Sequence, residues 1–547
     1  MEKFPSIFND VIGPVMRGPS SSHCAASLRI GRMCRDLMSG NIRRVLIEFD
    51  PNGSLATTHK GQGSDMGLFG GFLGWEADDE RLPDYEQAVQ AAGIEIRIDI
   101  LPIGAQHPNT YQITLWNESE QHSLIALSTG GGMIEVIAID SAPVQMDGDF
   151  FETLVYLKEK EKEEERVDVR QQLSQATMDL FAELSAMDEF DEINLHQGAG
   201  NFIEIKSQKP LSDKFLELMG SDARVESLRV IEPVLPVLSR KGLSVPFITV
   251  EKMLQYNQGK NLKLWELALH YESIRGGISQ EDVFEKMRRI IRIMRQAIET
   301  GIRGTNWQDR ILGPQSVGFK QEMENGTLVS GDVINTIILF TSAIMEVKSS
   351  MGVIVAAPTA GSCGALPGAV IGTASVLNLS EDDMVKAMLA AGLIGVFIAA
   401  HATFAAEVGG CMAECGSGCG MAAAGIVVLK DGSLEQSLAA ASMALQTSLG
   451  MVCDTIADRV EAPCLNRNVM AASNALSCAN MSLANYNHLI PLDEVIETMK
   501  KVGDAIPHTL RCTGLGGLAI TKTAKEIEAR LNNNMVPVGT ASGYKVC

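Results

Sequence analysis

The 547-residue sequence contains few aromatic and few basic side chains. Phe, Trp and Tyr make up 5% of it, and 46 Lys plus Arg are outnumbered by 67 Asp plus Glu, for a formal net charge of −21. A chain this acidic repels phosphate backbones and anionic lipid, so we expect neither nucleic acid nor a membrane as its partner. A small anionic substrate is still compatible with this charge, because a single pocket can be locally positive. With 46% hydrophobic residues, the composition also argues against wholesale disorder.

The sequence shows no secretory signal and no convincing membrane span. Residues 1–8 lack the basic and apolar regions of a signal peptide. The most apolar stretch, Ala387–Ala406, is long enough to cross a bilayer, but it is mostly Ala and Gly and is followed at once by Glu407. This pattern predicts a buried helix of a bundle, and we expect a soluble, cytoplasmic protein.

Cysteine is almost absent from the first two thirds of the chain. After Cys24 and Cys34 the next is Cys363, so nine of the 11 cysteines fall in the C-terminal part. The odd number and the lack of a signal favour a reducing compartment over a disulfide framework. The clustering predicts a thiolate site there, although free cysteine is also a common small core residue.

The order of predicted elements indicates a multidomain protein. Residues 1–150 mix short strands with helices, which predicts an α/β domain, and residues 151–240 follow the βαββαβ order of a small ferredoxin-like α+β domain. Residues 245–531 are mainly α-helical, and residues 532–547 read as a tail. Three serines in this helical part precede apolar runs and have the spacing of N-caps: Ser279, Ser380 and Ser433.

Three of the C-terminal cysteines could bind an iron–sulfur cluster. Cys411, Cys453 and Cys464 lack the compact C-x-x-C signature, so their spacing alone is a weak signal. Three thiolates can hold a 4Fe–4S cluster and leave one iron open as a Lewis acid for a hydroxyl or carboxylate. Cys415 and Cys419, which follow Cys411 at intervals of four, offer a competing triplet with it. Three ordinary core cysteines are the remaining alternative.

Eight short motifs occur in one particular order along the chain. They are Gly18–His23, Lys60–Asp65, His107–Asn109, Ser128–Gly132, Ala357–Gly361, Gly410–Glu414, Val452–Asp454 and Pro463–Asn468. Together they resemble the iron–sulfur-dependent L-serine dehydratases, with the β part before the α part as though two subunits were fused. Some members of that family carry an ACT-like regulatory domain where residues 151–240 lie, and a spacer that helps to pair subunits is the alternative.

The resemblance implies a cofactor, a reaction and an assembly. It implies a 4Fe–4S cluster held by Cys411, Cys453 and Cys464, no pyridoxal phosphate (PLP), a homodimer, and conversion of the amino acid L-serine to pyruvate and ammonia. In one-chain members a C-terminal cysteine occupies the open iron until substrate displaces it. Cys547, at the end of the predicted tail, stands at that position.

Several polar residues are candidates for holding the substrate. Backbone N–H groups of Thr359–Gly364 precede a helical run and could receive a carboxylate, and the hydroxyls of the serine run near residue 20 could do the same. With the positions that match the family motifs, the predicted substrate-binding residues are Ser20, Ser21, Ser22, Lys60, Thr359, Gly361, Arg467 and Asn468.

The sequence departs from the family at the general base. Gln62 stands where the family has the histidine that is the favoured base, and Gln takes up no proton at neutral pH. His59 and His23 are the two candidates to replace it. Three further motif positions also differ: Cys24, Cys363 and His401. These departures leave two alternatives to serine dehydration, namely the same cluster acting on another substrate, such as L-cysteine with loss of sulfide, and a non-catalytic iron–sulfur sensor.

Overall fold

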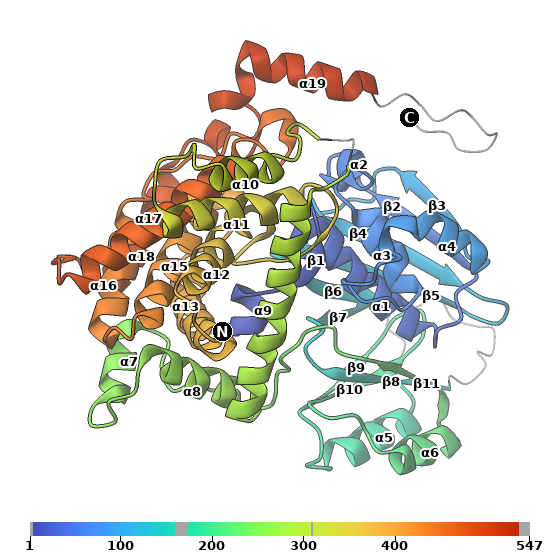
Figure 1. Ribbon diagram of the computed structural model, residues 1–547. Coiled ribbons are helices and arrows are strands. Elements are labelled where there is room, and N and C mark those ends of the chain that lie inside the picture. The colour runs from blue at the N-terminus through green and yellow to red at the C-terminus, as the bar shows by residue number, and fades with distance from the viewer. Residues whose placement is uncertain (1–3, 159–172, 308–309, 535–547) are drawn as a thin grey trace. The chain divides into compact units, whose positions relative to one another are not determined.

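The structure is a computed structural model that describes residues 4–158, 173–307 and 310–534 (Figure 1). The chain divides into two compact units, Met1–Pro246 with His270–Val283 (unit 1) and Phe247–Leu269 with Phe284–Cys547 (unit 2). The predicted α/β N-terminal region and the predicted helical C-terminal part are confirmed. The tail that includes Cys547 lies outside the described residues.

The first part of unit 1 is a six-stranded sheet with the strand order β3-β2-β4-β5-β6-β7. Strands β2 and β3 are parallel, and the other neighbouring pairs are antiparallel. The strands are β2 (Arg44–Phe49), β3 (Glu95–Ile100), β4 (Thr110–Trp116), β5 (Gln121–Gly130), β6 (Met133–Ile139) and β7 (Ala142–Met146). The other elements of this part are β1 (Val15–Arg17), α1 (Ala26–Leu37), α2 (Leu55–Thr58), α3 (Ser64–Phe72) and α4 (Tyr85–Ala91).

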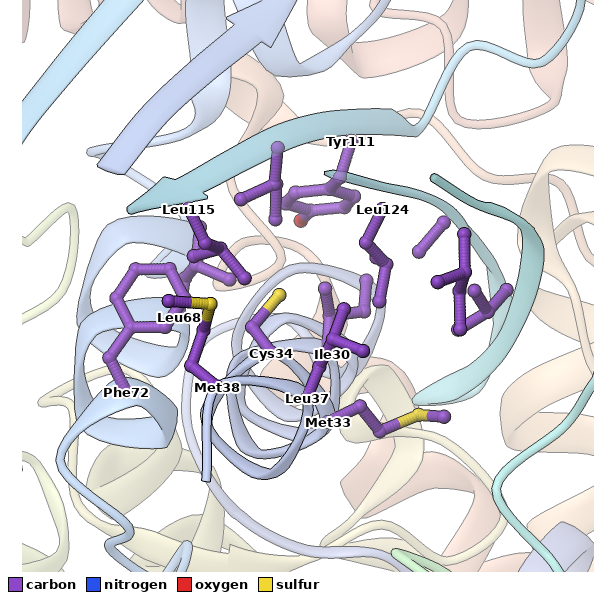
Figure 2. Close-up of a cluster of buried hydrophobic side chains, with 14 of the residues drawn as sticks. Ile30, Met33, Cys34, Leu37, Met38, Leu68, Phe72, Tyr111, Leu115 and Leu124 are labelled. Atoms are coloured by element: carbon purple, nitrogen blue, oxygen red, sulfur yellow. The ribbon is translucent and has the colours of Figure 1, made fainter. Parts of the chain in front are cut away.

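Helix α1 packs against this sheet through its apolar face (Figure 2). Ile30, Cys34 and Leu37 recur at helical spacing and are fully buried. They lie opposite Tyr111 and Leu115 of β4, a strand whose side chains alternate between the core and the other face. Cys34 is therefore an ordinary core cysteine. The same helix begins directly after the serine run, so this packing also fixes the position of that run.

The second part of unit 1 is a four-stranded antiparallel sheet with the order β11-β8-β10-β9. Its elements are β8 (Phe151–Leu157), α5 (Gln175–Ser185), β9 (Glu192–His196), β10 (Phe202–Ser207), α6 (Asp213–Ser221) and β11 (Val225–Ile231). This is the predicted βαββαβ order. Val155 and Ile203 pack with the two helices, whereas Leu154 and Phe202 belong to the core of the six-stranded sheet. The alternation of side chains thus gives each face of the sheet its own core.

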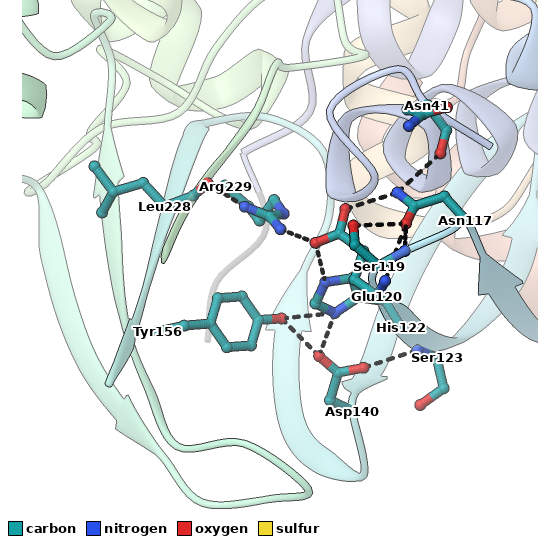
Figure 3. Close-up of polar contacts among 10 residues, drawn as sticks. All are labelled: Asn41, Asn117, Ser119, Glu120, His122, Ser123, Asp140, Tyr156, Leu228 and Arg229. Atoms are coloured by element: carbon teal, nitrogen blue, oxygen red, sulfur yellow. Dashed lines mark hydrogen bonds and ion pairs between the residues drawn. The ribbon is translucent and has the colours of Figure 1, made fainter. Parts of the chain in front are cut away.

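A buried polar cluster joins the two sheets of unit 1 (Figure 3). Asp140 accepts hydrogen bonds from the Tyr156 hydroxyl at 2.6 Å and from Nδ1 of His122 at 2.7 Å. Arg229 of β11 pairs with Glu120, the residue before β5. These contacts satisfy polar groups that would otherwise be costly to bury, so the packing of β8 and β11 on the first sheet is specific.

Unit 2 consists mainly of helices, together with the short strand β12 (Val353–Val355). The helices of this part of the chain are α7 (Val250–Asn257), α8 (Leu264–Gly276), α9 (Gln280–Arg303), α10 (Ser316–Glu324), α11 (Asp332–Lys348), α12 (Ala365–Val376), α13 (Glu381–His401), α14 (Ala406–Cys411), α15 (Ser417–Leu429), α16 (Leu434–Gln446), α17 (Cys464–Leu483), α18 (Leu492–Ala505) and α19 (Lys522–Asn534). Helices α8 and α9 contribute residues to both units. The predicted N-caps are confirmed, because Ser380 and Ser433 form capping boxes and the Ser279 hydroxyl accepts the Asp282 N–H.

Two helical stretches of unit 2 are long and apolar enough to cross a membrane. They are Glu381–His401 and Ala406–Leu429, and 78% and 89% of their most apolar windows are buried. Small residues allow the two to pack closely: a Cβ added to Gly425 would lie 3.1 Å from the carbonyl oxygen of Ala387. Such burial is typical of the core helices of a helical bundle.

Candidate functional site

A glycine brings the first candidate cysteine against a distant loop. Gly410 has a φ of +67°, and a Cβ there would lie 2.7 Å from the carbonyl oxygen of Met451. The N–H of Met412 donates to that same oxygen at 3.0 Å. The end of α14, including Cys411, is therefore held beside the loop that carries Cys453.

The other side of this loop is held by a segment near the end of unit 2. The Cys453 N–H donates to the carbonyl oxygen of Leu510 at 2.8 Å, and the Cys512 N–H donates to the carbonyl oxygen of Cys453 at 2.9 Å. These two bonds place Cys512 beside Cys453. The sequence analysis missed Cys512, because no motif or regular spacing connects it to the other cysteines.

The three predicted ligand cysteines meet in one buried region. Cys411 is in hydrogen-bonding contact with Cys453 and with Cys415, and Cys453 also contacts Cys512. Cys464, the first residue of α17, is an electrostatic neighbour of Cys411. All three predicted ligands are at most 2% exposed. Cys419, the last member of the competing triplet, accepts a hydrogen bond from Asn474 instead.

The thiol of Cys411 is the most acidic of this group. Hydrogen bonds from Cys415 and Cys453, followed by the charge of Arg467, hold the pKa of Cys411 well below its usual value. Burial and the neighbouring Cys411 raise the pKa of Cys464. Arg467 donates to the Cys411 sulfur at 3.3 Å and pairs with Asp454. Arg467, which was predicted to bind the substrate, therefore contacts Cys411, a candidate cluster ligand, directly.

The chemistry of these donors fits an iron–sulfur cluster. Within the described ranges, no group of three or more His, Cys, Asp or Glu side chains is arranged to hold a single metal ion. An iron–sulfur cluster takes one thiolate for each of its irons, so the test for a single metal ion does not apply to it. Buried thiols that converge beside a guanidinium are the soft, charge-balanced donor set that such a cluster takes.

The loop that starts at Thr359 is tied to Glu414. The Thr359 hydroxyl donates to Glu414 at 2.6 Å, and a Cβ on Gly361 would lie 2.7 Å from both carboxylate oxygens. Burial and the nearby Cys411 raise the pKa of Glu414 to about 8. Glu414 had no predicted role, although its position in the motif Gly410–Glu414 was a signal that could have found it.

Asn468 connects the same loop to the helix of Cys464. Its side-chain oxygen accepts the N–H groups of Gly364 and Ala365 at 3.2 and 3.0 Å, and its amide donates to the carbonyls of Gly361 and Cys464. Some of the backbone N–H groups of the predicted anion site are thus already engaged in hydrogen bonds within the protein. Within Thr359–Gly364, the N–H groups of Thr359, Ser362 and Gly364 all donate inside the protein.

A buried lysine borders this region. Lys348, at the end of α11, is 0% exposed, and its ammonium has no hydrogen-bond acceptor among the residues that the structure describes. Its charge acts on Cys464, Cys363 and Glu414, which places it beside both the thiols and the Thr359 loop. The sequence analysis assigned no role to Lys348.

The first candidate base in unit 1 is buried and held at both ring nitrogens. His23 Nδ1 lies 3.0 Å from the Ser20 hydroxyl, and its Nε2 lies 3.0 Å from the Thr58 hydroxyl. Burial lowers the pKa of His23 to about 4, so the ring is neutral at physiological pH. With both nitrogens engaged, His23 is better suited to positioning than to accepting a proton.

The second candidate base is oriented by a carboxylate. His59 Nδ1 lies 2.8 and 2.9 Å from the two oxygens of Asp65. This pairing places the proton on Nδ1 and leaves Nε2 free to accept one. His59 directly follows Thr58, so both predicted histidines belong to one polar group in unit 1.

The remaining predicted residues differ in their surroundings. Ser21 is buried, and the carbonyl of Ser22 accepts the Ser128 hydroxyl at 2.6 Å. Lys60 is 71% exposed and pairs with Glu86 at 3.0 Å, so the structure does not bring it to the histidines. Among the positions that depart from the family, Cys24 and Cys363 are buried, whereas His401 is exposed and pairs with the Ile248 carbonyl.

Comparison with known proteins assigns the chain to a family. The serine dehydratase alpha chain model matches residues 259–519. A Bacillus subtilis (strain 168) protein named as a probable L-serine dehydratase, alpha chain, is 37% identical over 285 residues, which are 52% of this chain and 95% of the relative. The L-serine dehydratase, alpha chain, of Peptoniphilus asaccharolyticus is 34% identical over 51% of this chain and 96% of its own length.

A further relative extends the similarity toward the N-terminus. L-serine dehydratase 2 of Escherichia coli (strain K12) is 26% identical over 526 residues, which are 92% of this chain and 96% of the relative. The chain belongs to the serine dehydratase alpha chain family and, like that relative, carries a preceding region in the same polypeptide.

Proposed function

We propose that this protein is an L-serine ammonia-lyase that removes water from L-serine and yields pyruvate and ammonia. The convergence of Cys411, Cys453 and Cys464 carries the proposal, because it lies in the part of the chain that matches the family. The names of the relatives supply the substrate. Loss of water from serine gives aminoacrylate, which tautomerises and hydrolyses without further help.

The three cysteines would hold a 4Fe–4S cluster, with Cys547 as the proposed fourth ligand. When bound, the cluster supplies a Lewis acid that makes the serine hydroxyl a better leaving group. Arg467 and Lys348 offset the negative charge of the thiolates. No PLP takes part in this proposal.

His59 is the proposed base. Its Nε2 removes the Cα proton while Asp65 holds the ring in the required tautomer and stabilises the imidazolium that forms. His23 stays neutral and positions the hydroxyl of Ser20. Ser20, Ser21 and Ser22 are together the proposed substrate contacts in unit 1.

In unit 2, Thr359 and Gly361 are the proposed substrate contacts. Arg467 and Asn468 already bind Cys411 and the Thr359 loop, so we assign them a positioning role in place of the predicted direct contact. Asn468 fixes the loop relative to Cys464.

We further propose a homodimeric, cytoplasmic enzyme whose βαββαβ part is ACT-like. Its strand order and the two helices on one face support the last point. The proposed domains are 1–150, 151–240 and 245–531, followed by the tail 532–547.

Anaerobic reconstitution with iron and sulfide, followed by turnover assays, tests the proposal. The wild type should gain the absorbance of an iron–sulfur cluster and release pyruvate and ammonia from L-serine. Cys453→Ser should lose both, whereas Cys419→Ser, whose sulfur contacts Asn474, should keep both. Release of sulfide from L-cysteine in place of pyruvate from serine would identify a desulfidase, and an intact cluster without turnover on any amino acid would identify a sensor.

A further inference from the structure

Lys348 is a buried cation without a hydrogen-bond partner. Its side chain is 0% exposed, and its ammonium bonds to none of the residues that the structure describes. Removing an ammonium from water without giving it an acceptor is costly, and such groups are rare in folded proteins. Lys348 is the last residue of α11, where the helix dipole favours a cation, but the dipole leaves its N–H donors unused. The ammonium is therefore poised to bind an anion.

The groups around this ammonium place it at the proposed active site. Its charge acts on Cys464, Cys363 and Glu414. Glu414 accepts its hydrogen bond from the Thr359 hydroxyl, at 2.6 Å, and none from Lys348. Cys464 is a proposed cluster ligand. An anion bound to Lys348 would therefore lie next to the cluster ligands and next to the Thr359 loop.

Other groups that were predicted to receive a substrate carboxylate are already engaged. Arg467 donates to the Cys411 sulfur and pairs with a carboxylate of its own. In the Thr359 loop, several backbone N–H groups donate inside the protein. Lys60 is exposed and pairs with Glu86. Lys348, in contrast, keeps its N–H donors available within the part of the chain that the structure describes.

We propose that Lys348 receives the α-carboxylate of the amino-acid substrate. This inference rests on the proposed function, from which it takes the substrate and the cluster. Lys348 lies outside all the motifs that carry the family resemblance, so the contact is a feature of this chain's own packing. Only Cα and Cβ separate the carboxylate of serine from its hydroxyl. Fixing the carboxylate at Lys348 therefore restricts the hydroxyl to the neighbourhood of Cys464.

The burial of Lys348 makes this contact a source of specificity. A carboxylate would neutralise the ammonium, whereas an uncharged analogue would leave it unpaired and shielded from water. L-Serinamide is such an analogue, since it keeps the hydroxyl, the amino group and the Cα–H of serine but lacks the negative charge. The contact recognises the carboxylate and not the leaving group, so it would hold L-cysteine equally well.

Paired kinetics on L-serine and L-serinamide test the proposal in the anaerobically reconstituted enzyme. We expect the wild type to prefer serine in kcat/KM, and Lys348→Met to lose at least about 30-fold of that preference, as for one partner removed from a buried charge pair. Both substrates are measured on one preparation, so the ratio does not depend on the fraction of chains that hold a cluster. Lys320→Met, which removes an exposed lysine of α10 paired with Glu324, is the matched control and should keep the wild-type ratio.

Equilibrium binding gives a second readout that requires no turnover. L-Alanine and L-alaninamide have no leaving group, so calorimetric titration of the reconstituted protein measures the same contact. Lys348→Met should weaken the binding of L-alanine by a similar factor and leave that of L-alaninamide unchanged. Lys348→Gln guards against misfolding, because it keeps a polar donor at the buried position, and it should also lose the preference for the carboxylate.

The outcomes separate this inference from the function on which it rests. An unchanged ratio of serine to serinamide in both variants would overturn the inference, even if iron content fell, and would leave Lys348 only to offset the charge of the thiolates. Equal binding of L-alanine and L-alaninamide by the wild type would overturn it as well. An intact cluster without serine turnover in the wild type would instead contradict the proposed function.

Discussion

Arg467 donates a hydrogen bond to the sulfur of Cys411 at 3.3 Å, and its other terminal nitrogen pairs with Asp454. The guanidinium is largely buried, with 15% of its side chain exposed, so its charge is poorly screened by water. Arg467 therefore links the acidity of Cys411, a proposed cluster ligand, to the ion pair with Asp454.

We expect Arg467→Met to weaken cluster binding. The variant removes the donor to Cys411 and leaves Asp454 without its partner, and loss of such an outer contact costs about 10–100-fold in metal affinity or activity. Iron and acid-labile sulfide per chain, measured after anaerobic reconstitution and again after brief exposure to air, check this. Arg295→Met, on the exposed face of α9 where it pairs with Glu381, is the control. Full iron retention in Arg467→Met would show that the contact has no role in holding the cluster.

His59→Asn should lower kcat by about 10²–10⁴-fold, the usual contribution of a general base. Asp65→Asn should cause a smaller loss in kcat with little change in KM, because Asp65 only orients the ring. Steady-state kinetics on L-serine with cluster content measured in parallel checks both. A His59→Asn enzyme as fast as the wild type would remove this residue from the mechanism.

His23 makes unit 1 less stable in mild acid. Its folded-state pKa is lowered from 6.5 to about 4 by burial, so between these values the unfolded chain binds a proton that the folded chain does not. Stability is thus fully present above pH 6.5 and is lost as the pH falls toward 4. Between pH 7 and pH 5 the free energy of unfolding should drop by about 2 kcal/mol through this group alone.

Urea unfolding followed by circular dichroism at the two pH values measures this drop. His23→Gln should show a pH dependence smaller by that amount, because glutamine does not titrate. His508→Gln, at an exposed position, should behave as the wild type does. An identical pH dependence in His23→Gln and the wild type would contradict the assignment.

Gly361→Ala should disturb the conformation of the Thr359 loop without a large loss of folding stability. The added Cβ would lie 2.7 Å from both oxygens of Glu414, so the carboxylate must move and its bond from Thr359 must break. We expect a fall in kcat/KM of at least about tenfold, the effect of losing one well-placed hydrogen bond. Gly318→Ala, in α10 with no atom near the added Cβ, is the control and should be neutral or stabilising.

Much of the fold follows from local sequence patterns. The capping boxes at Ser380 and Ser433 mark the starts of α13 and α16, and the alternation of apolar residues marks strands such as β4. The βαββαβ order could also be recognised, because its strands and helices are short and well separated by turns. These signals act over a few residues, which is why a single sequence is enough to detect them.

The candidate site was predictable only in part. The motifs named Cys411, Cys453 and Cys464, and the structure brings them together. Cys512 and Lys348 reach the same region through tertiary packing and lie in no recognisable pattern, so sequence reasoning had no means of finding them. The surroundings of two further predicted residues likewise depend on tertiary contacts. Arg467 binds Cys411, which is far away in sequence, and Lys60 pairs with Glu86 of a neighbouring helix.

The contacts of Cys453 with Cys411 on one side and Cys512 on the other have a practical consequence for handling the protein. Adjacent thiols in the emptied protein are well placed to couple oxidatively once air is admitted. If iron is removed in the presence of oxygen, the cysteines that would bind the cluster would then be blocked as disulfides. We therefore expect reloading to require a thiol reductant first, and the failure of a simple iron addition would reflect this trapped state rather than a damaged fold.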